Sequence, residues 1–219
     1  MRHLGGAVVV LLAGSLGGCA LHSEKPLITA NAPAPEIMEG RYQGFGPFGP
    51  EQLAKLSSAQ RAQCLDLGIR AVPPGTTTPV SVIHCPFNDS TLAPTNIAQL
   101  TRLADHFRFT GQNAEGKTEA IEAWLAPLRA PYYLAQIHIP VGELKGYFYG
   151  IVRAETGRIH FFMVPCAVEG LKSVGKPEPK LKCEITSLAA VRPDLLAETQ
   201  RIDAGSADPP MVLAAPVAP

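Results

Sequence analysis

A histidine and a cysteine stand side by side at His84 and Cys85, in the stretch VIHCPFND, and Asp89 follows four residues after the cysteine. A thiolate activated by a histidine is the nucleophile of many enzymes. Neighbouring residues of a strand point to opposite faces, however, which works against a direct pair, and a reactive cysteine must be unbridged. We therefore favour a disulfide at Cys85 and keep a hydrolase or thiol-dependent enzyme using His84 and Cys85 as the alternative.

His138 and His160 are the other histidines in chemically suggestive positions, each inside a β-rich stretch. Pairing the stretches as hairpins places His138 opposite Tyr147 and His160 opposite about Ile151. On that register the two rings are too far apart to share a metal or a proton. We interpret both as half-buried sheet histidines, and His138 remains a candidate only within the enzyme alternative.

Other catalytic or cofactor patterns are missing from the sequence after the first 18 residues. It has no Gly-x-Ser-x-Gly, no phosphate-binding glycine loop and no Cys-x-x-Cys. Glu115, Glu119 and Glu122 would share one face of a helix, which is usually a solvated face. We expect no catalytic residues, no metal and no cofactor, and hence a protein that is not an enzyme.

The amino terminus carries a different kind of chemistry. Arg2 and His3 precede a 13-residue apolar run, Leu4–Leu16, which is followed by Leu16-Gly17-Gly18-Cys19. The run is shorter than the roughly 20 residues of a membrane-spanning helix and fits the apolar core of an export signal. One interpretation is an ordinary signal peptide in which the cysteine stands by chance.

We favour a second interpretation, because this segment resembles the lipobox of bacterial lipoproteins. The resemblance implies cleavage before Cys19, transfer of a diacylglyceryl group with palmitate-type chains to the Cys19 thiol, frequent acylation of the new amino terminus, and attachment to the membrane through that residue. Two or three acyl chains hold a protein on a membrane stably. In enteric lipoproteins an aspartate after the cysteine favours retention in the inner membrane; here Ala20 stands there. The resemblance therefore predicts an outer-membrane anchor with the chain facing the periplasm.

The mature chain would carry 18 basic and 19 acidic residues, because residues 1–18 contain one arginine and no acid. A nearly neutral chain has no long-range field to attract nucleic acid, so we expect no nucleic-acid partner. Its length suits one domain with a core.

Four cysteines remain after Cys19, and an even number in an exported chain predicts two disulfides. Four cysteines allow three connectivities. We favour the two pairs that each close a loop of about 20 residues, namely Cys64–Cys85 and Cys166–Cys183.

The spacing of apolar residues predicts helices in the first half of the chain and strands in the second. Helices are expected over 51–67, or as two shorter helices with Ser57 or Ser58 as an N-cap, and over 95–107 and 118–128. Strands are expected over 80–85 and, as an antiparallel meander, over 132–139, 146–152 and 158–164. A fourth strand near 181–188 and a closing helix over 193–202 complete the pattern.

These elements predict an α+β fold, with helices packed on a three- to four-stranded antiparallel meander. The expected organisation is a signal peptide (1–18), a Pro/Gly-rich tether (19–50), one α+β domain (51–202) and a disordered tail (203–219).

Four lysines gather before and in the expected fourth strand, and such a group could contact an anionic lipid surface; a solvated loop is the alternative. They are Lys172, Lys176, Lys180 and Lys182. The sequence thus predicts an outer-membrane-anchored periplasmic lipoprotein with a disulfide-stapled domain, a non-catalytic role in envelope structure or partner binding, and an envelope protein as its partner.

Overall fold

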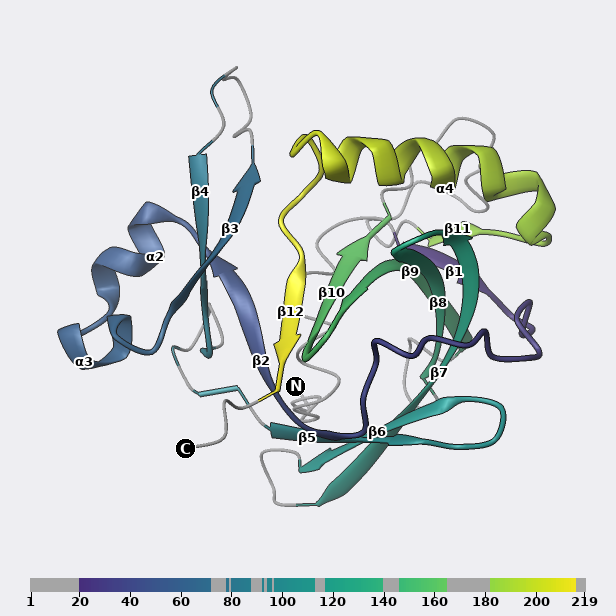
Figure 1. Ribbon diagram of the computed structural model, residues 1–219, viewed down its shortest axis with the longest axis horizontal. Coiled ribbons are helices and arrows are strands. Elements are labelled where there is room, and N and C mark those ends of the chain that lie inside the picture. The colour runs from purple at the N-terminus through teal and green to yellow at the C-terminus, as the bar shows by residue number, and fades with distance from the viewer. Residues whose placement is uncertain are drawn as a thin grey trace.

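The computed structural model describes residues 20–71, 78, 80–87, 92, 94–95, 97–112, 117–139, 146–164 and 182–215. Within these residues, eight antiparallel strands close into a barrel (Figure 1). In order around the barrel they are β2 (Gly40–Phe48), β5 (Ile97–Arg102), β6 (Phe107–Gln112), β7 (Thr118–Arg129), β8 (Tyr132–Ile139), β9 (Gly146–Glu155), β10 (Arg158–Met163) and β12 (Met211–Ala214).

The barrel closes through a strand from the end of the chain. β12 pairs with β10 on one side, for example His160 with Val212, and with β2 on the other, where Val212 faces Phe45. β10 in turn pairs with β9. Without β12, β2 and β10 would both keep open edges, which are a liability in any sheet.

Within the described residues, two further strand pairs and three helices surround the barrel (Figure 1). β1 (Ala20–Ser23) continues along the edge of β9 and pairs in parallel with β11 (Lys182–Glu184). β3 (Leu65–Ala71) and β4 (Val80–Cys85) form a hairpin beside β2. The helices are α2 (Pro50–Lys55), α3 (Ser58–Arg61) and α4 (Leu188–Asp203).

The expected α+β fold is wrong, because the segments assigned as helices over 95–107 and 118–128 are strands β5, β6 and β7. The physical reason is clearest in β7. Ile121 and Leu125 point into the barrel, whereas Trp124 and Leu128 pack on its outer side. A strand covered on both faces reproduces the spacings of three and four that usually indicate a helix.

The antiparallel meander is confirmed as β8, β9 and β10, and His138 faces Tyr147 as expected. His160, however, faces Arg153 and not Ile151, a register two residues away. The expected fourth strand is the short β11, which pairs with β1 and not with the meander. The closing helix is confirmed as α4, although it begins earlier, at Leu188.

The expected domain limits also change. Residues 20–48, taken as most of a tether, contribute β1, β2 and buried side chains such as Leu21 and Ile37. β12 lies within residues 203–219, which we expected to be disordered. The folded domain therefore extends well beyond 51–202 at both ends; residues 1–19 are outside the described part of the chain.

Two hydrophobic cores lie on opposite sides of the barrel wall. The inner core lies inside the barrel and receives residues from all eight strands, including Tyr42, Leu100 and Phe148. The outer core packs α4 through Val191, Leu195 and Ile202 against the outward faces of β7 to β10. The helix thus buries one face of the barrel while the interior is filled separately.

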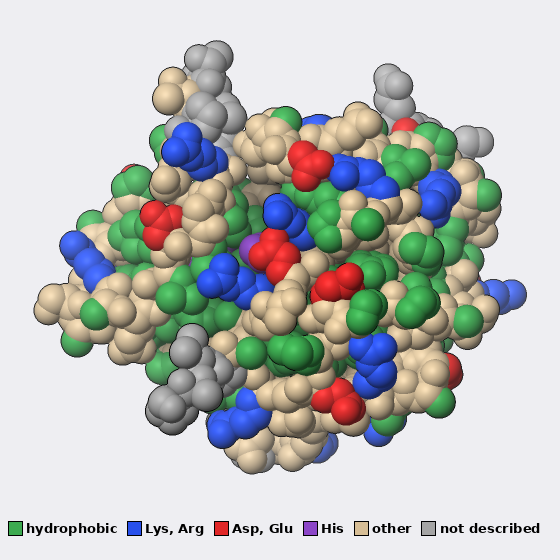
Figure 2. All heavy atoms as spheres, viewed as in Figure 1, with side chains coloured by type: hydrophobic (Ala, Val, Ile, Leu, Met, Phe, Trp, Pro, Cys, Tyr) green, Lys and Arg blue, Asp and Glu red, His purple; other side chains and the backbone are tan. Residues whose placement is uncertain are grey.

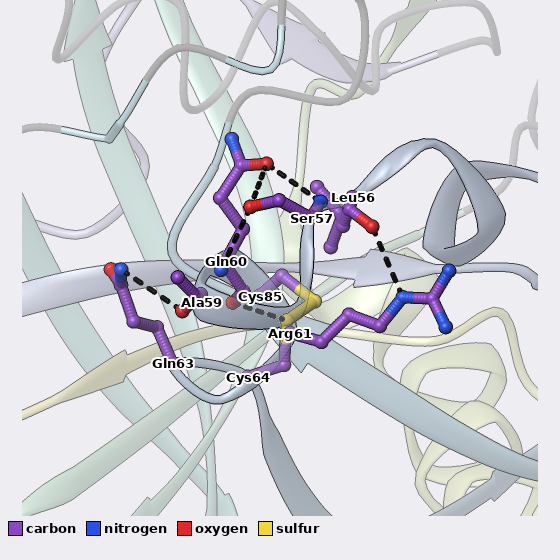
Figure 3. Close-up of a disulfide and its surroundings, with 8 residues drawn as sticks. All are labelled: Leu56, Ser57, Ala59, Gln60, Arg61, Gln63, Cys64 and Cys85. Atoms are coloured by element: carbon purple, nitrogen blue, oxygen red, sulfur yellow. Dashed lines mark hydrogen bonds between the residues drawn. A yellow bond between two sulfur atoms is a disulfide. The ribbon is translucent and has the colours of Figure 1, made fainter.

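Cys64 and Cys85 form a disulfide, which confirms one expected pair (Figure 3). The bridge joins the turn after α3 to the end of β4, where Cys85 is fully buried. Helix α3 is held by a capping box between Ser57 and Gln60, so the alternative of two short helices is confirmed, although the chain is already in strand β3 from Leu65 and the expected helical limit at 67 is wrong. Cys166 and the side chain of Cys183 lie outside the described residues, and the second pair stays a prediction.

Replacing both Cys64 and Cys85 by alanine should lower the free energy of unfolding by about 3 kcal/mol, because a bridge over 21 residues restricts the unfolded chain. Urea denaturation followed by circular dichroism measures this difference. Ser57→Ala, which removes only the nearby cap, is the control and should cost about 1 kcal/mol. A double variant as stable as the wild type would show that the bridge is absent or energetically neutral.

Candidate binding site

The barrel encloses a cavity of about 90 Å³ whose lining is entirely apolar. All the lining side chains are aliphatic, aromatic or thioether groups, and they come from every strand of the barrel except β2, together with Ile37 from the segment before β2. They are Ile37, Ala98, Phe107, Phe109, Ile121, Ala123, Leu125, Ala135, Ile137, Val152, Ile159, Phe161, Met211 and Leu213.

The cavity exists because small residues alternate with large ones on the inward faces. Ala123 on β7 and Ala135 on β8 are both buried in the inner core, where larger side chains would fill the space. Gly150 on β9 plays a different part, since a Cβ atom there would lie 2.3 Å from the ring of Phe161. The missing side chain at Gly150 therefore makes room for Phe161, which lines the cavity from β10.

One end of the barrel is crossed by the segment that precedes β2. Ala32 N donates to Leu125 O at 2.7 Å, and Ala34 and Ile37 belong to the inner core. Arg102, at the end of β5, donates from Nη2 to the carbonyl oxygens of Ala34 and Ile37 at 2.8 and 2.9 Å. This charged fork satisfies two carbonyl groups at once and fixes the segment over that end.

The same segment is fastened to the outside of the barrel by Gln136 on β8. This side chain is fully buried. Its Oε1 accepts from the backbone N–H groups of Leu27 and Ile28, at 2.7 and 2.8 Å, and from the Tyr149 hydroxyl at 3.0 Å, and its Nε2 donates to Ile28 O. A buried amide with all these partners specifies one position for the chain.

An apolar cavity of this kind does not attract water. A buried water needs two to four polar partners, whereas an engineered cavity of about 150 Å³ lined by Leu, Ile and Phe stays dry and binds benzene. The lining here offers carbon and sulfur atoms only. The interior is therefore suited to an apolar group and unsuited to a polar one.

A second hollow lies outside the barrel, across β2, β5 and β6, and has the opposite character. It is an open groove of about 520 Å³ lined by Arg41, Ile97 and polar uncharged side chains such as Gln99 and Thr110. Gln43 in this groove already donates to Thr95 Oγ1 at 2.6 Å. Its polar groups are partly satisfied within the protein, so the enclosed apolar cavity is the better defined site.

The structure separates the residues of the enzyme alternative. Cys85 is bridged to Cys64 and offers no thiolate. His84 is fully buried on β4, and its Nε2 lies 3.0 Å from Pro210 O, to which it donates. His138 is on the outer side of β8, stacked on Tyr147 with 4.9 Å between ring centroids. Asp89 lies outside the described residues.

A charged cluster surrounds two of the buried histidines, His84 and His160, near β12. Figure 2 shows a histidine there among acidic and basic side chains. His160 is 5% exposed, and its Nε2 lies 3.6 Å from Glu155 Oε2 with no hydrogen-bond partner among the described residues. Arg153 forms an ion pair with Glu155 at 2.9 Å. Because neither histidine is accessible, we assign the cluster a structural role.

Burial lowers the pKa of both histidines, because the charged imidazolium loses its hydration. The carbonyl groups of Pro210 and Val82 partly oppose this effect at His84. At His160 the main opposition comes from Glu155, while Arg153, Arg158 and His84 itself lower the pKa further. Both rings are therefore held neutral at pH 7.

The remaining sequence candidates do not gather into a site. Lys182 is in β11, where its backbone pairs with Ala20, and its side chain is not described; Lys172, Lys176 and Lys180 lie outside the described residues. No group of three metal-ligating side chains occurs in the described part of the chain. None of the described helices is both long and apolar enough to cross a membrane.

Comparison with known proteins adds no relative: the chain matches no protein-family model, no curated protein and no solved structure.

Acidification should destabilise the protein between pH 7.5 and 5. The folded-state pKa values of His84 and His160 lie below the unfolded value of about 6.5, so the unfolded chain binds protons first. Each histidine can contribute a slope of at most about 1.4 kcal/mol per pH unit. Urea titrations at several pH values measure the free energy of unfolding.

A double variant carrying His84→Gln and His160→Gln tests whether these two histidines cause the pH dependence of stability. Glutamine at position 84 retains a donor for Pro210 O but has no proton to gain. The free energy of unfolding of this variant should vary less over the same pH range than that of the wild type. An equal slope in the double variant would assign the pH dependence to other groups.

Proposed function

We propose that this protein is an outer-membrane-anchored periplasmic lipoprotein that acts by binding and not by catalysis. Cys19 carries the lipid anchor, and the barrel domain after it supplies the binding function, with an envelope protein as a partner. The observation that carries the binding role is the closed barrel with an apolar interior cavity.

The position of β1 bears on how the domain would be held. Ala20, the residue after Cys19, is already paired with Lys182, and Leu21 is 1% exposed against Tyr149 on β9. A lipid chain on Cys19 would thus be separated from the folded sheet by a single peptide bond. The anchored domain would rest at the membrane surface, where Lys182 and the lysines before it meet anionic head groups.

The disulfide supports an oxidising compartment. Cys64–Cys85 bridges a loop of 21 residues and has Cys85 fully buried, and such bonds persist in exported proteins. The same bridge removes the Cys85 thiol from chemistry, which disfavours a thiol enzyme.

The anchor is tested by Cys19→Ser expressed in a bacterial host. The wild-type protein should incorporate labelled palmitate and remain with the membranes after a carbonate wash, whereas Cys19→Ser should do neither. Cys64→Ser is the matched control and should still be acylated. Wild-type protein that takes up no palmitate would refute the lipoprotein proposal.

Membrane choice and partner are tested with the same strains. Ala20→Asp should move the acylated protein from the outer- to the inner-membrane fraction of a density gradient. The lipobox resemblance implies that an aspartate directly after the cysteine is the signal for inner-membrane retention. Cross-linking in cells should recover an envelope protein with the wild type. A domain that stays solitary would remove the partner from the proposal.

A further inference from the structure

We propose that the barrel cavity binds the methyl end of a hydrocarbon chain. This inference rests on the proposed function only for the source of the chain, which is the membrane to which Cys19 would be attached. The binding site itself is the described cavity between Ile37 at one end of the barrel and the inward side chains of the strands.

The chemistry of the lining selects the ligand class. A carboxylate, phosphate or sugar in this cavity would lose its hydration and find no donor or acceptor, since the lining side chains are all apolar. A hydrocarbon segment loses nothing polar and gains contacts with Phe109, Ile121 and Ile137. The ligand's polar group must therefore remain outside the barrel.

The size of the cavity limits how much of the ligand enters. About 90 Å³ is smaller than the roughly 150 Å³ of a benzene-binding cavity, so only a short apolar segment fits. A long-chain lipid would place its last few carbons inside and leave the remainder of the chain outside. The protein would accordingly discriminate little between head groups.

The construction of one barrel end opposes entry there. The segment fixed by Arg102 covers the end at which β5 finishes, and Gln136 fastens the chain just before it. A hydrocarbon chain could not enter at that end without displacing this segment.

The experiment uses the chain that starts at Ala20, which contains every described element of the fold. Octanoate is added, and the methyl NMR signals of isoleucines are followed; those of Ile121 and Ile137 should shift. Octanedioate, which has the same length but a carboxylate at each end, is the matched ligand control and should shift neither signal.

Replacing either of two alanines by leucine, one inside the barrel and one outside it, locates the binding site. Ala135→Leu fills the cavity from β8 and should weaken octanoate binding at least tenfold, whereas Ala120→Leu, on the exposed outer face of β7, should leave it unchanged. If Ala135→Leu does not fold, Leu213→Ala enlarges the cavity and should bind octanoate more tightly than the wild type.

Three results would show that the cavity is only a packing defect, and each of them overturns the proposal. They are an absence of shifts with octanoate, equal shifts with octanedioate, and wild-type octanoate affinity in folded Ala135→Leu. Equal affinity in Leu213→Ala would do the same.

The source of the chain is read from native mass spectrometry of the acylated protein. A lipid bound non-covalently would show that the hydrocarbon chain comes from the membrane. An acylated protein that no longer binds octanoate would show that the chain of its own anchor occupies the cavity. If Cys19 is acylated but the chain that starts at Ala20 does not bind octanoate, only this inference is refuted. If that chain binds octanoate but Cys19 is not acylated, only the proposed anchor is refuted.

Discussion

The closure of the barrel by β12 is the constraint on which the rest of the structure depends. This strand of four residues joins β10 to β2, and so connects the last part of the chain to the first. Its side chains alternate between the two sides of the barrel wall: Leu213 faces the cavity, and Val212 packs outside in a separate apolar cluster with Phe45 and residues of β3. Such pairing over long sequence distances makes the cavity a property of the whole chain.

The helix α4 fixes that closure from outside. Arg129 and Tyr132, at the turn between β7 and β8, both bond Asp203 at the end of the helix, and Arg129 also donates to Thr199. The hydrogen bond from Tyr132 lowers the pKa of Asp203, while burial raises the pKa of Tyr132 to about 12. Residues 204–210 connect the helix to β12, so these bonds hold the chain close to the closing strand.

Local signals in the sequence predicted local structure well. The stretches around His138 and His160 alternate and gave the meander, and the loop between Cys64 and Cys85 gave a disulfide. The helix expected over 118–128 was wrong because β7 is covered on both faces, so that its apolar residues have the spacing of a helical stripe; they are Ile121, Trp124, Leu125 and Leu128. The sequence contains no mark that distinguishes such a strand from a helix when each face is apolar.

The cavity could not be predicted for a related reason. Ala123 and Ala135 are ordinary residues in the sequence, and their shortness matters only once closure brings them to face one interior. The early segment illustrates the same point: its Pro, Gly and Ala content suggested a tether, yet Arg102 and Gln136, more than 60 residues later, hold it in place. Composition reports what a segment can do alone, whereas partners elsewhere in the chain decide whether it is ordered. Ala20 shows this most directly, because it belongs to the sheet although composition assigned it to a tether.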